Sequence, residues 1–135
     1  MEVSPQQICQ DLLALLGRVK QEMLAIAEAE HLTQVQLGTL YMLDQYGDLA
    51  MGEVANMLHC DPSNVTGVVD RLVAQNLVSR QENKIDRRAK TISLLPAGKR
   101  IVDAAVAALP GRLGCSKLTG SERAVLRQTV QKIVD

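Results

Sequence analysis

The stretch that decides the fold is residues 61–90, DPSNVTGVVDRLVAQNLVSRQENKIDRRAK. It predicts a capped helix with a small polar outer face, then a strand, then a basic loop around Asp86, Arg87 and Arg88, and a second strand follows at residues 91–94. An α-helix fits the major groove of DNA, and an arginine-tipped hairpin beside it can reach the neighbouring minor groove. The order helix, helix, strand, basic loop, strand is that of a winged helix-turn-helix.

The predicted helix over residues 62–75 has one apolar and one polar face. Val65, Val68, Val69 and Leu72 form the stripe expected to be buried. Hydroxyl and amide groups near a helix N-terminus can hydrogen-bond base edges, and the positive end of the helix dipole favours phosphates. On the helix alone, mere solvation of the polar face is an open alternative. The candidate DNA-binding residues of the outer face are Ser63, Asn64, Thr66, Gly67 and Arg71, beside Asp70.

The glycine within this helix is a local cost, because glycine in a helix interior is roughly 1 kcal/mol less favourable than alanine. The absence of a side chain at Gly67 would let the helix sit closer to the floor of the groove.

The basic loop favours the DNA-binding interpretation of the helix before it. A basic loop by itself is usually only solvated, but here it follows a helix-turn-helix directly, and Asp86 is its sole acid. We expect Asp86 to orient one arginine through a charge-assisted hydrogen bond while the other arginine enters the minor groove. The candidate DNA-binding residues of the wing are Lys84, Asp86, Arg87, Arg88 and Lys90, beside Asn83.

The charge distribution agrees with this position for the recognition elements. The formal net charge of the 135 residues is zero. Residues 1–60 hold two basic and eight acidic side chains, residues 61–100 hold eight and four, and residues 101–135 hold five and three. Local positive charge matters more for phosphate binding than the total. The chain has no Phe or Trp and two Tyr, which disfavours single-stranded nucleic acid because its binding relies on aromatic stacking.

Other classes of protein find little support in the sequence. No stretch approaches the roughly 18 apolar residues of a membrane span, and the N-terminus lacks a basic region followed by an apolar run, so we expect a soluble, cytoplasmic protein. A Ser/His/Asp set, a glycine-rich phosphate loop and an HExxH motif are all missing, so an enzyme is disfavoured. No cofactor is expected.

Metal and disulfide sites are not expected either. Cys9, Cys60 and Cys115 are odd in number and widely separated, and they show no zinc-ligand spacing. His31 and His59 are isolated from other plausible ligands, so surface or helix-capping roles are expected for both.

The remaining helices are marked by their capping residues. Helices are predicted at about 5–29 after Ser4-Pro5, from Thr33 to Tyr46, at 52–58, at 97–109 before Pro110-Gly111, and from Thr119 onward. Asp61 is expected to cap the helix at 62–75, and Asn76 to take the left-handed position after it. The plan is one domain over residues 1–135, with a winged lobe at about 32–98 flanked by helices at about 4–30 and 97–135.

The flanking helices carry apolar residues at helical spacing. The first helix has apolar residues on two faces, which suggests two neighbours: its own domain and a second subunit. The alternative is an ordinary intramolecular core. The candidate dimerisation residues are Ile8, Leu12, Leu15, Leu16, Val19, Leu126, Val130 and Ile133.

Over roughly residues 32–98 the chain resembles the MarR family of bacterial and archaeal transcriptional regulators. The resemblance rests on Leu32-Thr33, on the run CDPSNVTG at residues 60–67, on DRL at 70–72 and on DRRA at 86–89. Three positions depart from the usual pattern: Asn76 stands where glycine is common, Leu95 where threonine is often found, and Met51 where a hydroxyl often precedes the third helix.

The resemblance implies an obligate homodimer with intertwined first, fifth and sixth helices. Its two recognition helices would lie roughly 34 Å apart on an inverted-repeat operator. It further implies a regulator, most often a repressor, that is released by a small anionic or phenolic ligand or by cysteine oxidation. Cys9 lies near the position of the reactive cysteine of peroxide-sensing members, but no neighbouring cation would lower its pKa, so a buried or inert thiol is expected. The alternative function is a winged-helix protein-interaction module that does not bind DNA.

Overall fold

The computed structural model describes residues 2–86 and 88–135. In this part of the chain six α-helices, one short 3₁₀ helix and a small three-stranded sheet are present, which confirms the expected mainly α fold with a hairpin. The chain divides into two compact units: a central unit, Met23–Ala105, and a terminal unit formed by Met1–Glu22 with Val106–Asp135. Helices α1 (Pro5–Ala29) and α5 (Pro96–Arg112) run through both.

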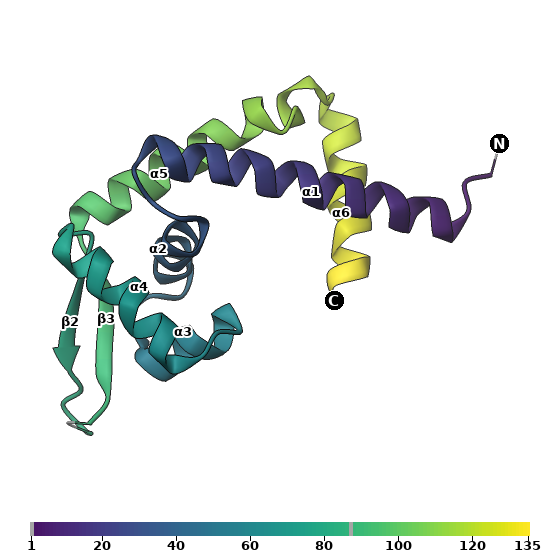
Figure 1. The fold of residues 1–135 in the computed structure, drawn as a ribbon. Coiled ribbons are helices and arrows are strands. Elements are labelled where there is room, and N and C mark those ends of the chain that lie inside the picture. The colour runs from purple at the N-terminus through teal and green to yellow at the C-terminus, as the bar shows by residue number, and fades with distance from the viewer. Residues whose placement is uncertain (1, 87) are drawn as a thin grey trace. The chain divides into compact units, whose positions relative to one another are not determined.

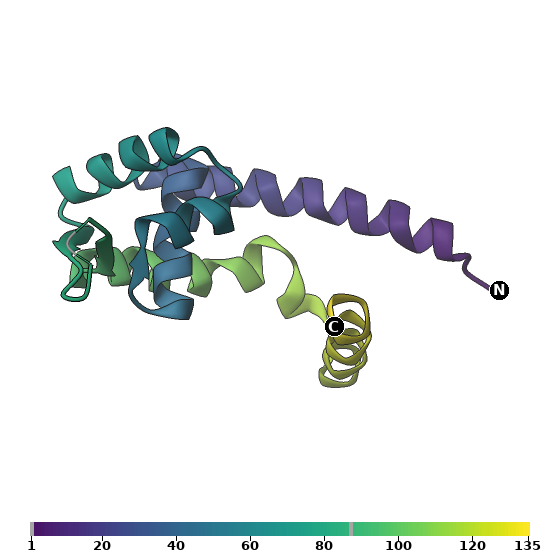
Figure 2. The same cartoon turned by 90° about the horizontal axis from the view of Figure 1, so that it is seen from below.

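Three helices form the body of the central unit: α2 (Gln34–Tyr46), α3 (Met51–Leu58) and α4 (Pro62–Ala74). They lie together in both ribbon views (Figures 1 and 2). The predicted capping box of α2 is confirmed, because Thr33 Oγ1 accepts from the Gln36 amide at 3.1 Å and Gln36 Oε1 accepts from the Thr33 amide at 2.9 Å. Gly47 ends α2 with a positive φ of 78°.

The sheet contains one strand more than the predicted hairpin. Strands β2 (Val78–Glu82) and β3 (Lys90–Leu94) form the hairpin, and β1 (Leu49–Ala50) pairs with the other edge of β3, giving the order β1-β3-β2. Both pairings are antiparallel. The two-residue strand β1 lies between α2 and α3 in the chain, so its pairing with Thr91 and Ile92 of β3 attaches the hairpin to the helices.

The core of the central unit is aliphatic and lies between the helices and β3. Branched side chains from every element of the lobe meet there, as expected for a chain with almost no aromatic residues. The fully buried large side chains are Leu37, Leu40, Val54, Val65, Val69, Leu72, Val78, Ile92 and Val102.

The connection from α4 to the hairpin is a Schellman turn with asparagine in the glycine position. Asn76 has a φ of 58°, its amide donates to Val73, and the Leu77 amide donates to Leu72. Asparagine adopts the left-handed backbone conformation more readily than most residues other than glycine. The prediction for Asn76 is therefore confirmed, and the departure from glycine leaves the turn intact.

The predicted end of the fifth helix was wrong. The helix α5 does not stop before Pro110 but continues through it to Arg112. Proline removes one backbone donor and is most disruptive in the middle of a helix. Here it lies in the last turn, and the next helical bond, from the Leu113 amide to the Leu109 carbonyl at 2.8 Å, is formed.

The first turns of α5 are fixed tightly to the rest of the central unit. Lys99 Nζ lies 2.7 Å from Asp44 of α2 and 3.0 Å from Asp103, and the hydrogen bonds to these two carboxylates raise the pKa of Lys99. Next to it, Gly98 is buried against the backbone of Leu77, whose carbonyl also accepts from the Leu95 amide at 3.0 Å.

Replacing Gly98 by alanine is expected to lower the free energy of unfolding by roughly 1–3 kcal/mol, the usual cost of overpacking. A Cβ there would overlap the Leu77 carbonyl oxygen and lie 2.7 Å from Leu94 Cδ1. Gly38→Ala in α2 is the matched control: nothing lies within 4 Å of its added Cβ, so it should raise stability by up to about 1 kcal/mol. Urea denaturation of the two variants measures both, and equal effects would contradict this packing.

The terminal unit contains the N-terminal part of α1, the end of α5, a 3₁₀ turn (Cys115–Lys117) and α6 (Gly120–Val134). The predicted capping box of α6 is confirmed: Thr119 Oγ1 accepts from the Glu122 amide at 3.2 Å, and the Glu122 carboxylate accepts from the Thr119 amide at 2.8 Å. Arg112 joins α5 to α1 through an ion pair with Glu22 at 3.0 Å. No described residue of this unit is buried.

No helix among the described residues is both long and apolar enough to cross a membrane.

Candidate nucleic-acid interface

The outer face of α4 is exposed, as predicted. Val65, Val69 and Leu72 are buried, and Val68 is half-buried, so the apolar stripe anchors the helix in the core. The residues proposed for the outer face are all solvent-exposed: Ser63, Asn64, Thr66, Gly67, Asp70 and Arg71.

The N-terminus of α4 differs from the prediction in one respect. Asp61 does not cap the helix with its side chain. Instead its backbone carbonyl accepts from the Asn64 amide at 3.0 Å and the Val65 amide at 3.2 Å, and Pro62 has no amide that needs a partner. Thr66 Oγ1 donates to the Pro62 carbonyl at 3.1 Å, which leaves its oxygen lone pairs to accept. The positive end of the α4 dipole is therefore accessible to a ligand.

The surface at Gly67 is open, because nothing lies within 4 Å of where a Cβ would stand. A helical glycine with free space around it is not required by the packing of this chain. The close approach of DNA at Gly67 stays a prediction.

An ion pair between α4 and the hairpin was not foreseen. Arg80 of β2 and Asp70 of α4 form a pair at 2.5 Å between Nη1 and Oδ1. It joins the outer side of α4 to the middle of strand β2. The sequence does not predict this pair, because the two residues meet only through the packing of β2 beside α4.

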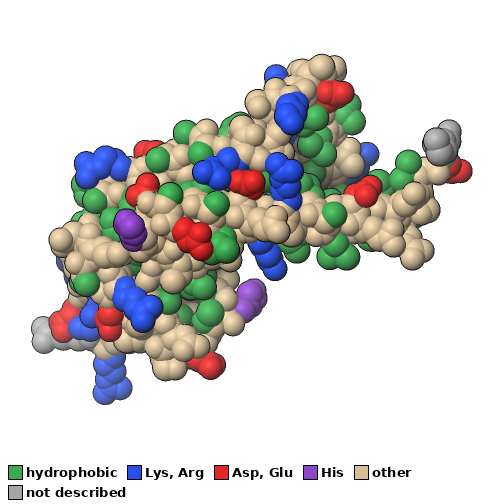
Figure 3. Space-filling model, turned by 45° about the horizontal axis from the view of Figure 1, so that its top comes forward, with side chains coloured by type: hydrophobic (Ala, Val, Ile, Leu, Met, Phe, Trp, Pro, Cys, Tyr) green, Lys and Arg blue, Asp and Glu red, His purple; other side chains and the backbone are tan. Residues whose placement is uncertain are grey.

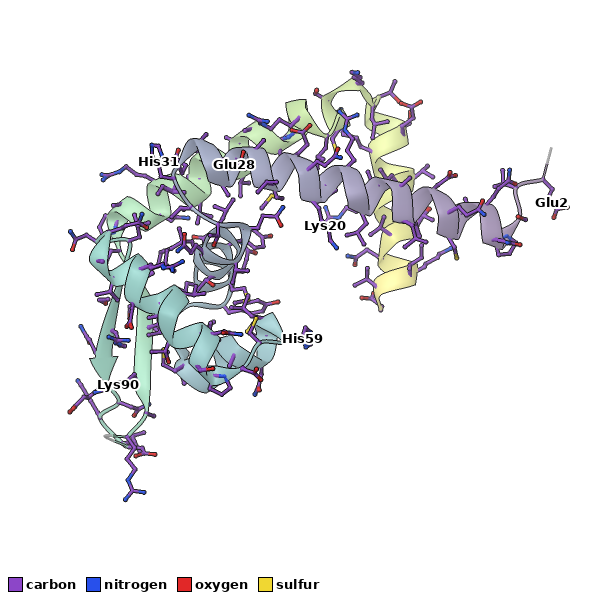
Figure 4. The ribbon with its side chains drawn as sticks, viewed as in Figure 1. Glu2, Lys20, Glu28, His31, His59 and Lys90 are labelled. Atoms are coloured by element: carbon purple, nitrogen blue, oxygen red, sulfur yellow. The ribbon has the colours of Figure 1, made fainter. Side chains whose placement is uncertain are left out.

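Arg71 lies in a different setting from the N-terminal residues of α4. It lines an open groove of about 530 Å³ together with residues from the end of α1 and the start of α2. It follows Ser63 by about two helical turns, so the structure does not group it with the N-terminal polar residues. Its contact with DNA stays a prediction. The other groove residues are Glu28, His31, Leu32, Thr33, Gln36, Ala74 and Gln75; Glu28 and His31 are labelled in Figure 4.

The tip of the wing is held by side chains that bond to its backbone. Asn83 Oδ1 accepts from the Ile85 amide at 2.8 Å and the Asp86 amide at 3.4 Å. Asp86 Oδ1 accepts from the backbone amide of Arg88 at 3.0 Å. The expectation that Asp86 orients an arginine side chain is therefore not met at Arg88, since a carboxylate two residues before an amide closes an Asx turn. Arg87 lies outside the described residues.

The cations of the wing are not equivalent. Lys90 Nζ pairs with Glu82 at 3.2 Å, because the two residues face each other in the hairpin register. Lys84 and Arg88 are exposed. Lys90 therefore closes the last strand pair before the loop (Figure 4), while Lys84 and Arg88 lie within the loop itself. Figure 3 shows Lys and Arg side chains next to acidic ones at the wing end of the central unit.

The structure shows how far each cysteine and histidine is exposed. Cys9 is exposed, so of the expected buried or inert thiol the structure excludes the buried form, and an inert thiol stays a prediction. Cys115 is exposed as well, and Cys60 is half-buried with its thiol donating to the Leu58 carbonyl at 3.3 Å. His31 and His59 are exposed and take left-handed conformations just after α1 and α3, which confirms the expected surface or capping roles.

The central unit is a winged helix-turn-helix: α3 and α4 form the helix-turn-helix, and the β2–β3 hairpin is its wing. A model of the MarR family matches residues 32–90. The chain belongs to the MarR family, as its motifs indicated.

Two curated relatives illustrate the similarity. The transcriptional repressor MdtR of Bacillus subtilis (strain 168) is 38% identical over 87 residues, which are 64% of this chain and 56% of that protein. The transcriptional repressor NicR of Pseudomonas putida is 26% identical over 141 residues, covering all of this chain and 89% of NicR. The chain thus matches little more than half the length of MdtR.

Solved structures agree over the full chain. The YusO protein of Bacillus subtilis is 30% identical with a TM-score of 0.72, and the match covers 98% of each chain. The apo form of wild-type MarR from E. coli has a TM-score of 0.82 over the whole of both chains. Its 20% identity establishes similarity of fold alone.

Proposed function

We propose that this protein is a sequence-specific regulator of transcription that binds double-stranded DNA. The observation that carries the proposal is the exposed polar face of α4, tied by the Asp70–Arg80 ion pair to a hairpin with exposed cations near its tip. A rigid helix of this kind can enter the major groove while the wing reaches the adjacent minor groove. A structure of an E. coli MarR variant with operator DNA shares this fold, with a TM-score of 0.70 at 20% identity.

The acting form in this proposal is a homodimer. The terminal unit has no buried described residue, yet it carries many large apolar side chains with a third to three quarters of their surface exposed. Exposed apolar surface of this extent marks an association site. A second copy is the natural occupant, since a twofold axis would also match two recognition helices to an inverted repeat. The exposed residues among the predicted contacts are Ile8, Leu12, Leu15, Leu16, Leu126, Val130 and Ile133, and Val19 is half-buried.

The proposed sense of regulation is repression relieved by a small ligand or by oxidation. Two relatives are named repressors. A structure described as the mechanism by which 6-hydroxynicotinic acid regulates DNA binding of Bordetella bronchiseptica BpsR has this fold, at 23% identity and a TM-score of 0.68. For this chain the exposed thiol of Cys9 is accessible to an oxidant. Either signal would act by favouring a half-site spacing that no longer matches the operator.

The test of DNA binding is selection of duplexes from a random pool, followed by titration of the selected duplex at several salt concentrations. If roughly eight phosphates are contacted per dimer, the plot of log affinity against log salt should have a slope of about −7. A selected inverted repeat and a steep slope are expected. Failure to enrich any duplex, or affinity that does not change with salt, would favour a protein-interaction module instead.

A further inference from the structure

An isoleucine at the tip of the wing has no structural role that the fold can account for. Ile85 is 98% exposed, the largest exposed fraction of any large apolar side chain that the structure describes. Apolar residues exposed on α1, α5 and α6 belong to helix faces, but Ile85 stands in the mostly polar seven-residue loop 83–89 between two strands. Single exposed apolar residues are common on protein surfaces, so its meaning depends on how it is held.

The loop holds its backbone through groups other than the Ile85 side chain. The amide of Ile85 donates to Asn83 Oδ1 at 2.8 Å, the amide of Arg88 donates to Asp86 Oδ1 at 3.0 Å, and the Ala89 amide donates to the Asp86 carbonyl at 3.0 Å. The Asn83 amide closes the loop on the Ala89 carbonyl at 2.9 Å. A β-branched residue is not favoured in such a turn. Position 85 is thus presented at a fixed place, while its side chain contributes nothing to the turn.

The residues next to Ile85 in the loop indicate which kind of surface its side chain would contact. Lys84 and Arg88, both exposed, lie on either side of it along the loop. Cations attract the loop to phosphates, which border the minor groove, and the walls of that groove are the apolar faces of deoxyribose. Apolar side chains, isoleucine among them, are used by proteins that bind the minor groove.

We propose that Ile85 makes an apolar contact with the deoxyribose wall of the minor groove when the wing binds duplex DNA. This rests on the proposed function and adds a residue that acts by burial, where the neighbouring cations act by charge. The removal of apolar surface from water is insensitive to counterions, whereas each phosphate contact adds to the salt dependence of binding. The two kinds of contact are therefore separable in one experiment.

The experiment measures affinity for the selected duplex by fluorescence anisotropy at four salt concentrations. Ile85→Ala and Ile85→Asn are each expected to bind about tenfold more weakly at every salt concentration, since a dimer loses two partly buried side chains. The salt slope should equal that of the wild type, and Ile85→Leu should stay within about threefold of it. Lys84→Ala is the matched control: loss of a phosphate contact should make the slope shallower.

Thermal unfolding separates this proposal from a structural role. Because the side chain is 98% exposed among the described residues, all three variants at position 85 should melt at the wild-type temperature. Wild-type affinity in both Ile85→Ala and Ile85→Asn would overturn the proposal while leaving the proposed function in place. A loss of affinity accompanied by a changed slope or a lower melting temperature would also overturn it. Failure of the wild type to bind any duplex would overturn the proposed function with it.

Discussion

The variant in which Arg87 and Arg88 are both alanine is expected to bind the operator at least about 100-fold more weakly than the wild type. A dimer would lose four guanidinium groups, and a specific arginine contact to DNA contributes about 1–3 kcal/mol. The backbone at Arg88 is held by the hydrogen bond from its amide to Asp86, so the exposed side chain projects from a fixed point of the loop. Anisotropy titration at physiological salt measures the effect, and the salt slope should become shallower as well.

A control for this variant must remove the same charge elsewhere. Arg127→Ala with Lys132→Ala does so on α6, at exposed positions of the terminal unit. If the loss came only from net charge, the control would weaken binding equally. Wild-type affinity in the wing variant, or equal losses in the two double variants, would contradict the assignment of the wing to DNA.

The second large effect is expected on the dimer. Replacing Leu126 and Val130 by glutamate should convert the protein to a monomer and lower operator affinity by at least about 100-fold. In the single chain these side chains are 49% and 40% exposed, so glutamate is tolerated there, but burial of an unpaired carboxylate against a second copy costs several kcal/mol. A monomer would hold one half-site and lose the contribution of the second. Light scattering after size exclusion gives the mass, and anisotropy gives the affinity.

The same helix provides the matched control. Gln128→Glu with Gln131→Glu adds the same charge to α6 at positions that are exposed and off the apolar stripe. This control should remain a dimer with operator affinity within about threefold of the wild type, since exposed surface charges have small effects. A dimeric Leu126→Glu, Val130→Glu variant would show that the partner covers another face.

Much of the fold follows from local signals in the sequence. The capping boxes at Thr33 and Thr119 form as expected, because both partners of each box lie within three residues and need no tertiary context. Asn76 takes the left-handed position for a similar reason. The hairpin was predicted from two short strands on either side of a basic loop, and β2 and β3 form it.

The features that were missed depend on contacts between distant residues. The strand β1 has two residues, too few to show any alternation, and exists only because β3 offers it an edge. The pairs Asp70–Arg80 and Glu82–Lys90 depend on which strand lies next to α4 and on the hairpin register. Pro110 predicts a helix end from sequence, but it falls in the last turn of α5, where the loss of one backbone donor is tolerated. At the start of α4 the backbone carbonyl of Asp61 accepts hydrogen bonds, and in the loop the carboxylate of Asp86 accepts from a backbone amide. Residue type alone does not predict these partners.

The central claim is that α4 and the wing lie in adjacent grooves of one duplex. It is tested most directly with a DNA-cleaving iron chelate attached to a single cysteine, either Ser63→Cys or Lys84→Cys, in a protein whose Cys9, Cys60 and Cys115 are serine and which still binds the selected duplex. The chelate at position 63 should cut within each half-site, and the chelate at position 84 should cut in the flanking minor groove, both symmetrically about the centre of the inverted repeat. Cleavage from neither position, or the same pattern as from a chelate at Arg127→Cys on α6, would contradict the account.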